Sequence, residues 1–270
     1  MIFHYLKIAF RNLCKHKTQN IISIIGLAVG LLCFCVCIYC SRFVESTDHC
    51  FANHDRIAEL NLYDGKADRY FSGSPVPLAE ELRTWSLGET EAISSVTYPR
   101  ERPYYVELSP EKTLPYELET IEIDTCYNKI FTPEMVAGHW KMASQSLNSV
   151  ILSQSMAIKI FGNAESAIGK HMTLMRRLNT SPESTPKTGG IVYIIQAVMK
   201  DIPLNNSLDF MQNIDMLTVN DSEGLLQSPK RHNMTGANTY VLLSPQTTCT
   251  DLEKRFFQRD YTYTLYGEAY

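Results

Sequence analysis

The sequence predicts an α+β protein in which one N-terminal transmembrane helix precedes a mixed domain of two interleaved lobes. Three observations favour this fold: an uncharged apolar run near the N-terminus, alternating helix-like and strand-like segments after it, and a balanced composition. The chain has 270 residues, 44% of them hydrophobic and 20% charged, and a formal net charge of -4. This composition excludes fibrous and disordered proteins. Because the chain has no basic surplus, its charge does not indicate a nucleic-acid partner.

Residues 1–19 form a basic segment that we expect on the cytoplasmic side of a membrane. Its cations are Lys7, Arg11, Lys15 and Lys17. No acidic residue precedes Glu45. Within residues 3–16 apolar side chains recur at near-helical spacing between the cations, which favours a short amphipathic helix lying on anionic lipid headgroups. The alternative is that the cations only set the topology of the chain, and the two interpretations are compatible.

Residues 20–40 are predicted to cross the bilayer. The run has no charge and no proline, and as a helix it would be about 31 Å long, close to the roughly 30 Å of a hydrocarbon core. A secretory signal peptide has a shorter apolar region and a small-residue cleavage site, which residues 38–42 do not provide. The positive-inside rule then places the N-terminus in the cytoplasm and residues 41–270 outside.

Two glycines in the predicted span, Gly26 and Gly30, form a GxxxG pattern. Such a pattern allows the backbone of a neighbouring helix to approach closely, so it predicts a helix-packing face. Glycine is also common in membrane helices that have no such role, and that alternative stays open.

Three cysteines are exported, at positions 50, 126 and 249. Three cysteines can form at most one disulfide within the chain, and we predict none.

Segments outside the membrane alternate between the two kinds of secondary structure. Helices are expected over residues 78–85, 153–161 and 251–258, the second capped by Ser153 and ended by Gly162. Strands are expected over residues 104–108, 118–123, 171–178, 191–200 and 239–243. Residues 109–115 are expected to form a turn, and residues 179–190 a polar tip. Mixed segments of this kind predict the α+β class.

Three short motifs resemble those of a penicillin-binding or β-lactamase-like serine enzyme. They are an SxxK at Ser109–Lys112, an SxN at Ser146–Asn148 and a KTG at Lys187–Gly189. That chemistry needs the SxxK at the start of a helix, but Pro110 and Pro115 flank it and disfavour a helix there. The motifs are therefore interpreted as coincidental, and no catalytic residue is predicted.

Histidines and acidic residues gather just outside the membrane, over residues 48–55. Their spacing matches no standard metal-ligand pattern, and we expect a solvated connector rather than a metal site. The chain has no GxxxxGK[ST] motif and no GxGxxG motif. No bound cofactor is therefore expected, and no ATP binding through a P-loop.

Four stretches of sequence resemble FtsX-like, MacB-type ABC transporter permeases, in the order in which that family has them. They are residues 6–32 at the first membrane helix, 54–60 just after it, and 148–174 and 192–210 in the periplasmic core. The residues that match the core signature are Phe161, Gly162, Ile168, Gly169, Asp201, Pro203 and Ser207. We expect these residues to be folding determinants.

The resemblance implies a permease subunit of the bacterial inner membrane that pairs as a homodimer or heterodimer. It also implies an ATP-binding partner subunit whose motion is passed to the periplasmic domain. Permeases of this family continue into three further membrane helices, whereas this sequence stops at Tyr270. The expectation is a fragment, a truncated product or a stand-alone relative. The alternative function is a single-pass anchored binding or sensor module without an ATPase, and no residue pattern indicates the substrate.

Overall fold

The computed structural model describes most of the chain. The described residues are 4–5, 11, 15, 17–65, 68–85, 87–109, 112–174, 190–208, 213–221, 224–226, 235–258, 264–265 and 268–269. The chain separates into two compact units, Met1–Thr47 and Asp48–Tyr270. The first unit contains the long helix, and the second is the mixed domain.

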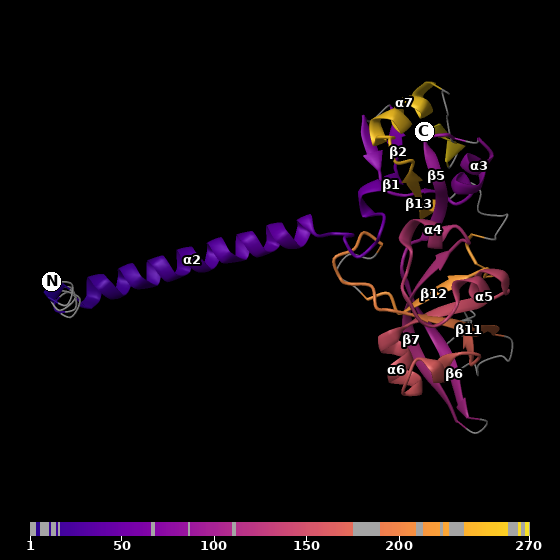
Figure 1. Ribbon diagram of the computed structural model, residues 1–270, viewed down its shortest axis with the longest axis horizontal. Coiled ribbons are helices and arrows are strands. Elements are labelled where there is room, and N and C mark those ends of the chain that lie inside the picture. The colour runs from indigo at the N-terminus through magenta and orange to yellow at the C-terminus, as the bar shows by residue number, and fades with distance from the viewer. Residues whose placement is uncertain are drawn as a thin grey trace. The chain divides into compact units, whose positions relative to one another are not determined.

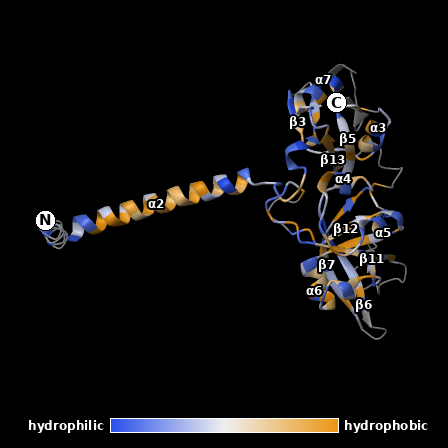
Figure 2. Ribbon diagram, viewed as in Figure 1, coloured by the Kyte–Doolittle hydropathy of each residue, from blue (hydrophilic) through white to orange (hydrophobic). Residues whose placement is uncertain are grey.

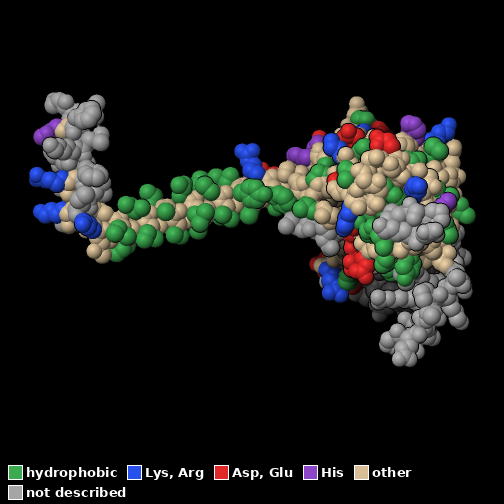
Figure 3. All heavy atoms as spheres, turned by 90° about the horizontal axis from the view of Figure 1, so that it is seen from below, with side chains coloured by type: hydrophobic (Ala, Val, Ile, Leu, Met, Phe, Trp, Pro, Cys, Tyr) green, Lys and Arg blue, Asp and Glu red, His purple; other side chains and the backbone are tan. Residues whose placement is uncertain are grey.

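The long helix α2 spans Lys17–Glu45, so it includes the predicted run and extends beyond it at both ends. None of its residues is buried. Most of its residues are apolar (Figure 2). Figure 3 shows hydrophobic side chains along the helix and basic side chains only near its ends. Within the described part of the chain it is the one helix that is long and apolar enough to cross a membrane.

The domain contains short helices and many strands. The helices are α3 (Leu78–Thr84), α4 (Tyr127–Phe131), α5 (Trp140–Gln145), α6 (Gln154–Phe161), α7 (Cys249–Gln258), and the 3-10 turns η1 (His54–Arg56) and η2 (Glu165–Ala167). The strands are β1 (Ile57–Leu60), β2 (Leu62–Asp64), β3 (Arg69–Phe71), β4 (Ser74–Pro75), β5 (Thr90–Thr97), β6 (Arg100–Ser109), β7 (Lys112–Ile123), β8 (Met135–Gly138), β9 (Ser149–Ser153), β10 (His171–Leu174), β11 (Ile191–Met199), β12 (Met216–Val219), β13 (Thr235–Leu243), β14 (Thr264–Leu265) and β15 (Glu268–Ala269). The α+β class is as predicted.

Most strands belong to one eleven-stranded sheet, part of which closes on itself. Strand β7 pairs with β12, and the ladder continues through β9, β11, β10 and β6. Strand β6 then pairs with β7 again over a long antiparallel hairpin. The result is a closed ring of strands, which leaves these strands few free edges. We call this part, with α5 and α6, the ring lobe.

The rest of the sheet is built on β13, which pairs with β1, β4 and β5. With α3 and α7 these strands form the terminal lobe, whose segments come from both ends of the domain sequence. Figure 1 shows the elements of the two lobes gathered at opposite ends of the domain. The ladder joins the lobes through β5 and β7 at one residue pair, Val96 and Ile123. This is the predicted interleaved arrangement.

Side-chain packing joins the lobes more extensively than the backbone ladder does. The largest core cluster contains Val96 and Tyr240 of the terminal lobe together with Ile121 and Leu217 of the ring lobe. Helix α4 packs against β5 and β13, and Phe131 at its end contacts the ring of Tyr240, with the centroids 5.1 Å apart. Because burial of aromatic side chains is strongly stabilising, this shared core holds the two lobes as one domain.

Several elements confirm the sequence prediction. Helix α6 has Ser153 as its N-cap, whose side chain accepts from the backbone N–H of Met156, and Gly162 as its left-handed C-cap. Helix α3 lies where predicted, α7 begins two residues earlier, and β10 and β11 pair as expected. Residues 175–189, with most of the predicted polar tip, lie outside the described residues.

One prediction, the turn at residues 109–115, was wrong. Strand β6 runs to Ser109 and β7 already begins at Lys112, so most of the predicted turn belongs to a strand. Pro115 pairs with Tyr105 of β6. At that position β7 has β6 as its neighbour on one side, and β12 joins it only from Thr120 onwards. Proline has no backbone N–H to donate, and it is tolerated here because the other edge of the strand is unpaired at this position.

Candidate functional site

The residues that the sequence singles out lie in helix α2, in the segment that begins the domain and around α6. In α2, a Cβ placed on Gly26 or Gly30 meets no atom within 4 Å. Cys33 and Cys37 continue the same face at spacings of three and four residues. The face therefore presents small side chains to whatever packs there.

The basic residues before α2 are only partly described. Arg11, Lys15 and Lys17 are helical and exposed, as cations that meet headgroups would be. Lys7 lies outside the described residues. At the other end Arg42 occupies the last turn of α2, where a cation interacts favourably with the helix dipole. Tyr39 and Phe43 stack there with ring centroids 6.3 Å apart, and aromatic side chains are typical of a membrane interface.

Residues 48–56, which we call the junction segment, begin the domain directly after the helix unit. Most of its residues are exposed or half-exposed, as expected of a solvated connector, but the segment is also anchored to the domain core. Phe51 is 5% exposed and packs in the shared core, with its ring 4.9 Å from that of Phe131. A buried aromatic side chain fixes the segment to the domain.

Polar bonds of the junction segment reach helix α4 and the terminal lobe. The Asn53 side chain donates to the carbonyl oxygens of Lys129 and Ile130 in α4, each at 3.3 Å. The Arg56 guanidinium donates to the carbonyl oxygen of Leu243 at 2.9 Å and to Glu91 at 3.0 Å, both in the terminal lobe. Any displacement of the junction segment is therefore resisted at several points of the domain.

The histidines of the junction segment contact one another. The rings of His49 and His54 have centroids 4.4 Å apart, and the His54 ring lies 3.2 Å from the carboxylate of Asp55. In the part of the chain that the structure describes, no group of three or more His, Cys, Asp or Glu side chains could hold a metal ion. Partial desolvation, followed by the charge of Asp48, raises the pKa of the exposed Cys50 thiol to about 11, so the thiol is protonated near neutral pH.

The signature residues at the end of α6 serve turns and packing. Gly162 and Gly169 have φ of 87° and 77°, which side chains other than glycine rarely adopt. The backbone N–H of Gly169 donates to the carbonyl oxygen of Ile195 in β11 at 2.8 Å. Phe161 and Ile168 pack against the ring-lobe core. These residues fix α6 and η2 to the ring of strands.

The remaining signature residues lie together after β11. The Asp201 carboxylate accepts from the backbone N–H of Ser155 at 2.9 Å and from the Ser155 hydroxyl, so it caps α6. The carbonyl oxygen of Pro203 accepts from the Asn206 side chain at 2.7 Å. The backbone N–H of Ser207 donates to the Asp48 carboxylate at 2.7 Å. The sequence predicted these positions but not their connection to the junction segment.

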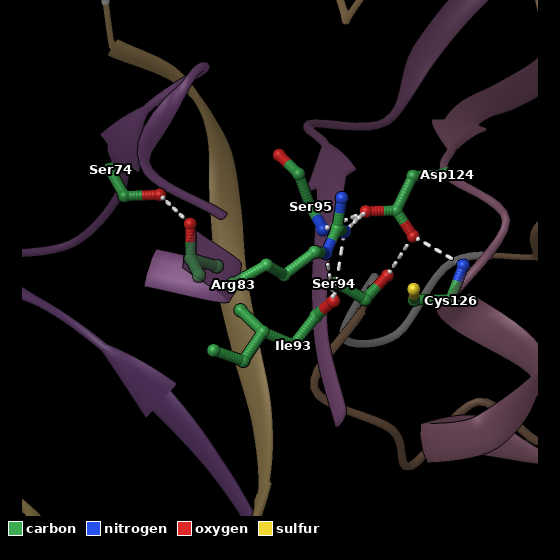
Figure 4. Close-up of polar contacts among 8 residues, drawn as sticks. Ser74, Arg83, Ile93, Ser94, Ser95, Asp124 and Cys126 are labelled. Atoms are coloured by element: carbon green, nitrogen blue, oxygen red, sulfur yellow. Dashed lines mark hydrogen bonds and ion pairs between the residues drawn. The ribbon is translucent and has the colours of Figure 1, made fainter. Parts of the chain in front are cut away.

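Asp124 is a polar hub that sequence reasoning missed (Figure 4). It lies just beyond β7 and accepts from the Ser94 hydroxyl at 2.7 Å and from the backbone N–H of Ser95 at 2.9 Å. It also accepts from the backbone N–H of Cys126 at 2.9 Å and forms an ion pair with Arg83 of α3. The hub joins the terminal lobe to the ring lobe beside the single ladder pair. An acidic residue directly after a buried strand was the available signal.

A second polar cluster is buried in the ring lobe. Glu122 is 3% exposed and accepts from the backbone N–H groups of Leu225 and Leu226 at 2.7 and 2.9 Å. Burial raises the pKa of Glu122 above its ordinary value, even though these two bonds lower it. Nearby, the Tyr193 hydroxyl donates to Asp221 at 2.9 Å. Burial raises the pKa of Tyr193 as well, so the hydroxyl remains a donor. The cluster is enclosed, which suits a structural role.

The serine-enzyme motifs are not assembled into a site within the described residues. Ser109 ends β6 and Lys112 begins β7, so the SxxK lies at a hairpin end and not on a helix. Ser146 follows α5 and Asn148 has a φ of 50° in the next turn. The KTG at 187–189 lies outside the described residues. Cys50, Cys126 and Cys249 are unbridged.

Comparisons with known proteins agree with this fold. No protein-family model matches the chain. A search of curated proteins also finds no match. A domain described as that of a permease protein from Porphyromonas gingivalis is 21% identical, with a TM-score of 0.56 over 77% of this chain and 84% of that one. The periplasmic region of MacB from Actinobacillus actinomycetemcomitans is 13% identical, with a TM-score of 0.50 over 80% of this chain and 86% of that one. The predicted resemblance is thus confirmed at the level of the fold, because the chain has a MacB-like periplasmic core fold and a membrane-length N-terminal helix.

Proposed function

We propose that the chain is a membrane subunit of an ABC transporter of the MacB/FtsX type. In this role it passes ATP-driven motion from a partner ATPase to its periplasmic domain, for the export or release of a substrate. The observation that carries the proposal is that the fold of a MacB periplasmic region directly follows a helix of membrane-spanning length. Neither feature alone implies a transporter, but their order along the chain is that of a permease.

The charge pattern around α2 supports the proposed orientation. Arg11, Lys15 and Lys17 precede the apolar run, and no acidic residue occurs before Glu45. The positive-inside rule favours a cytoplasmic N-terminus for such a helix and a periplasmic domain after it. In the proposal Gly26 and Gly30 pack against a helix of a second permease subunit, either a copy of this chain or a related one.

The junction segment supports a role in transmitting motion. Phe51 is buried in the shared core, while Asn53 bonds to α4 and Arg56 to the terminal lobe. A loosely solvated connector would absorb a displacement of the helix, whereas a segment held at several points passes it on. No few residues of the domain encode a ligand class, so the proposal names no substrate.

We further propose that the chain is not an enzyme. The serine of the SxxK motif ends a strand at a hairpin, so Lys112 is not held one helical turn from Ser109 as that chemistry requires. Ser109→Ala is expected to leave any hydrolytic activity of the purified chain unchanged. Loss of a measurable hydrolytic activity in this variant would contradict the proposal.

The test is recovery of an ATP-binding subunit with the full chain. The tagged chain is extracted from its native membrane in mild detergent, and co-purified proteins are labelled with a photoreactive ATP analogue and sequenced. We expect a labelled P-loop protein with the wild type and with Ala28→Leu, which adds bulk on another face of α2. The double variant Gly26→Leu/Gly30→Leu is expected to lose the second permease subunit, and with it the labelled protein. A chain that stays alone in every case contradicts the proposal and favours the anchored sensor module.

A further inference from the structure

Two segments that are far apart in the sequence meet at the start of the domain: Asp48, and the loop that follows β11. We infer that Asp48 and residues 201–208 form one coupling element, which connects the junction segment to the N-terminus of α6. The inference rests on the proposed function and deepens it, since it names the part of the domain that first receives the motion of the helix.

Asp48 bonds the loop at two points. Its backbone N–H donates to the carbonyl oxygen of Asn205 at 3.0 Å, and its carboxylate accepts from the backbone N–H of Ser207 at 2.7 Å. Its φ is 64°, a left-handed conformation that aspartate tolerates better than most residues. Because one residue makes both bonds, Asp48 cannot shift against the loop without breaking a bond to a charged acceptor.

The loop itself is internally braced. Asn206 is fully buried, donating to the carbonyl oxygen of Pro203 at 2.7 Å and accepting from the backbone N–H of Leu208 at 2.9 Å. Ile202 and Leu208, at the two ends of this brace, belong to the shared core. A braced loop moves as a unit, so a displacement at Ser207 reaches Asp201.

The far end of the element is the cap of α6. Asp201 accepts from both the backbone N–H and the hydroxyl of Ser155 in the first turn of that helix. Met156 and Ile160 then pack α6 into the ring-lobe core. These bonds therefore form a continuous path from the first residue of the domain to a helix on the ring of strands. The other carboxylate of the junction segment, Asp55, is exposed and bonds only locally to His54 among the described contacts.

The experiment must show that a change at Asp48 alters the stability of the bonds at Ser155, because proximity alone does not demonstrate energetic coupling. Hydrogen–deuterium exchange is followed in the full chain in lipid nanodiscs, for the wild type and three variants. Asp48→Gly keeps the left-handed backbone but removes the carboxylate, and Asp48→Asn keeps an acceptor at the same position. Asp55→Ala is the matched control. Amides of α3, in the terminal lobe, report any general loss of stability.

We expect Asp48→Gly to speed exchange about tenfold at Ser207 and also at Ser155, with α3 unchanged. Asp48→Asn should restore most of the protection, and Asp55→Ala should change neither site. Since coupling is reciprocal, Asp201→Ala should speed exchange at Ser207 as well as at Ser155. Faster exchange at Ser207 alone, or equal acceleration throughout the domain, would overturn the inference. No ATPase takes part, so this outcome is independent of the test of the proposed function.

Discussion

Helix α2 and the mixed domain satisfy the same physical demand in opposite ways. Leu27 and Leu32 of α2 are 76% and 65% exposed, whereas Ile151 and Leu217 of the ring lobe are fully buried. Apolar surface avoids water in both regions. The domain achieves this with its own closed ring of strands. Helix α2 leaves its apolar side chains exposed and is long enough to cross a membrane, so it suits a lipid environment.

Truncation of an apolar side chain is expected to have very different effects in the two regions. Phe131→Ala removes a ring that stacks on Tyr127 at 4.7 Å and contacts Phe51, so the domain should lose about 3 to 5 kcal/mol of unfolding free energy. Leu31→Ala in α2 should leave the thermal unfolding of the domain unchanged. Calorimetry of the two variants in nanodiscs measures both. An equal loss would mean that α2 belongs to the domain core.

Glycine-to-alanine substitutions should also affect the two regions differently, because the space beside each backbone differs. Gly138 has a φ of 70°, and a Cβ there would lie 2.3 Å from the carbonyl oxygen of Gln196, so Gly138→Ala should destabilise the domain by about 2 to 3 kcal/mol. Gly30→Ala meets nothing within 4 Å and raises helix propensity, so the domain should keep its stability. Denaturant titration compares them. A Gly138→Ala domain as stable as the wild type would refute this account of the β8–β11 contact.

Polar hubs exist in the domain and have no counterpart on the apolar face of α2. The Asp124 carboxylate accepts from four groups. In Asp124→Asn the side-chain NH₂ would face one or more of these donors and could not accept from them, so we expect the free energy of unfolding to fall by about 2 kcal/mol. Glu134→Gln breaks an exposed ion pair with Lys200 and should cost less than about 0.5 kcal/mol. Chemical unfolding of the two variants measures the difference. Similar losses would show that Asp124 does not join the lobes.

The smallest effect is a pH dependence. Burial raises the folded-state pKa of Glu122, so the folded domain binds this proton more tightly than the unfolded chain does. The corresponding stability is complete below the ordinary carboxyl value of 4.5 and is lost as the pH rises through the folded-state pKa. The wild type should therefore gain stability relative to Glu122→Gln as the pH is lowered, measured by parallel melts. A difference that is constant with pH would contradict this.

Local signals in the sequence predicted the elements that local physics determines. The apolar run predicted α2, and Ser153 and Gly162 predicted both ends of α6, because capping depends on residues a few positions away. The resemblance placed Asp201 and Ser207 among the structural residues. In each case the residues that determine the element lie close together in the chain or belong to a known motif.

Pairing between distant segments could not be predicted in this way. The pairing of β10 with β6, which closes the ring, and the parallel pairing of β12 with β7 join segments whose short apolar stretches fit several partners. Asp48 and Asp124 look like ordinary turn residues in the sequence. Their roles arise from groups such as Ser207 and Arg83, which only the fold brings to them.

The most direct test of the account is the side of the membrane on which each end of α2 lies. Chains with a single cysteine are labelled in intact spheroplasts with a membrane-impermeant maleimide: one keeps the exposed Cys249, the other carries Lys17→Cys, and all other cysteines are replaced by serine. We expect Cys249 to react in intact spheroplasts and the position 17 thiol to react only after lysis. Protection of Cys249 until lysis would contradict an anchored domain outside the cytoplasm.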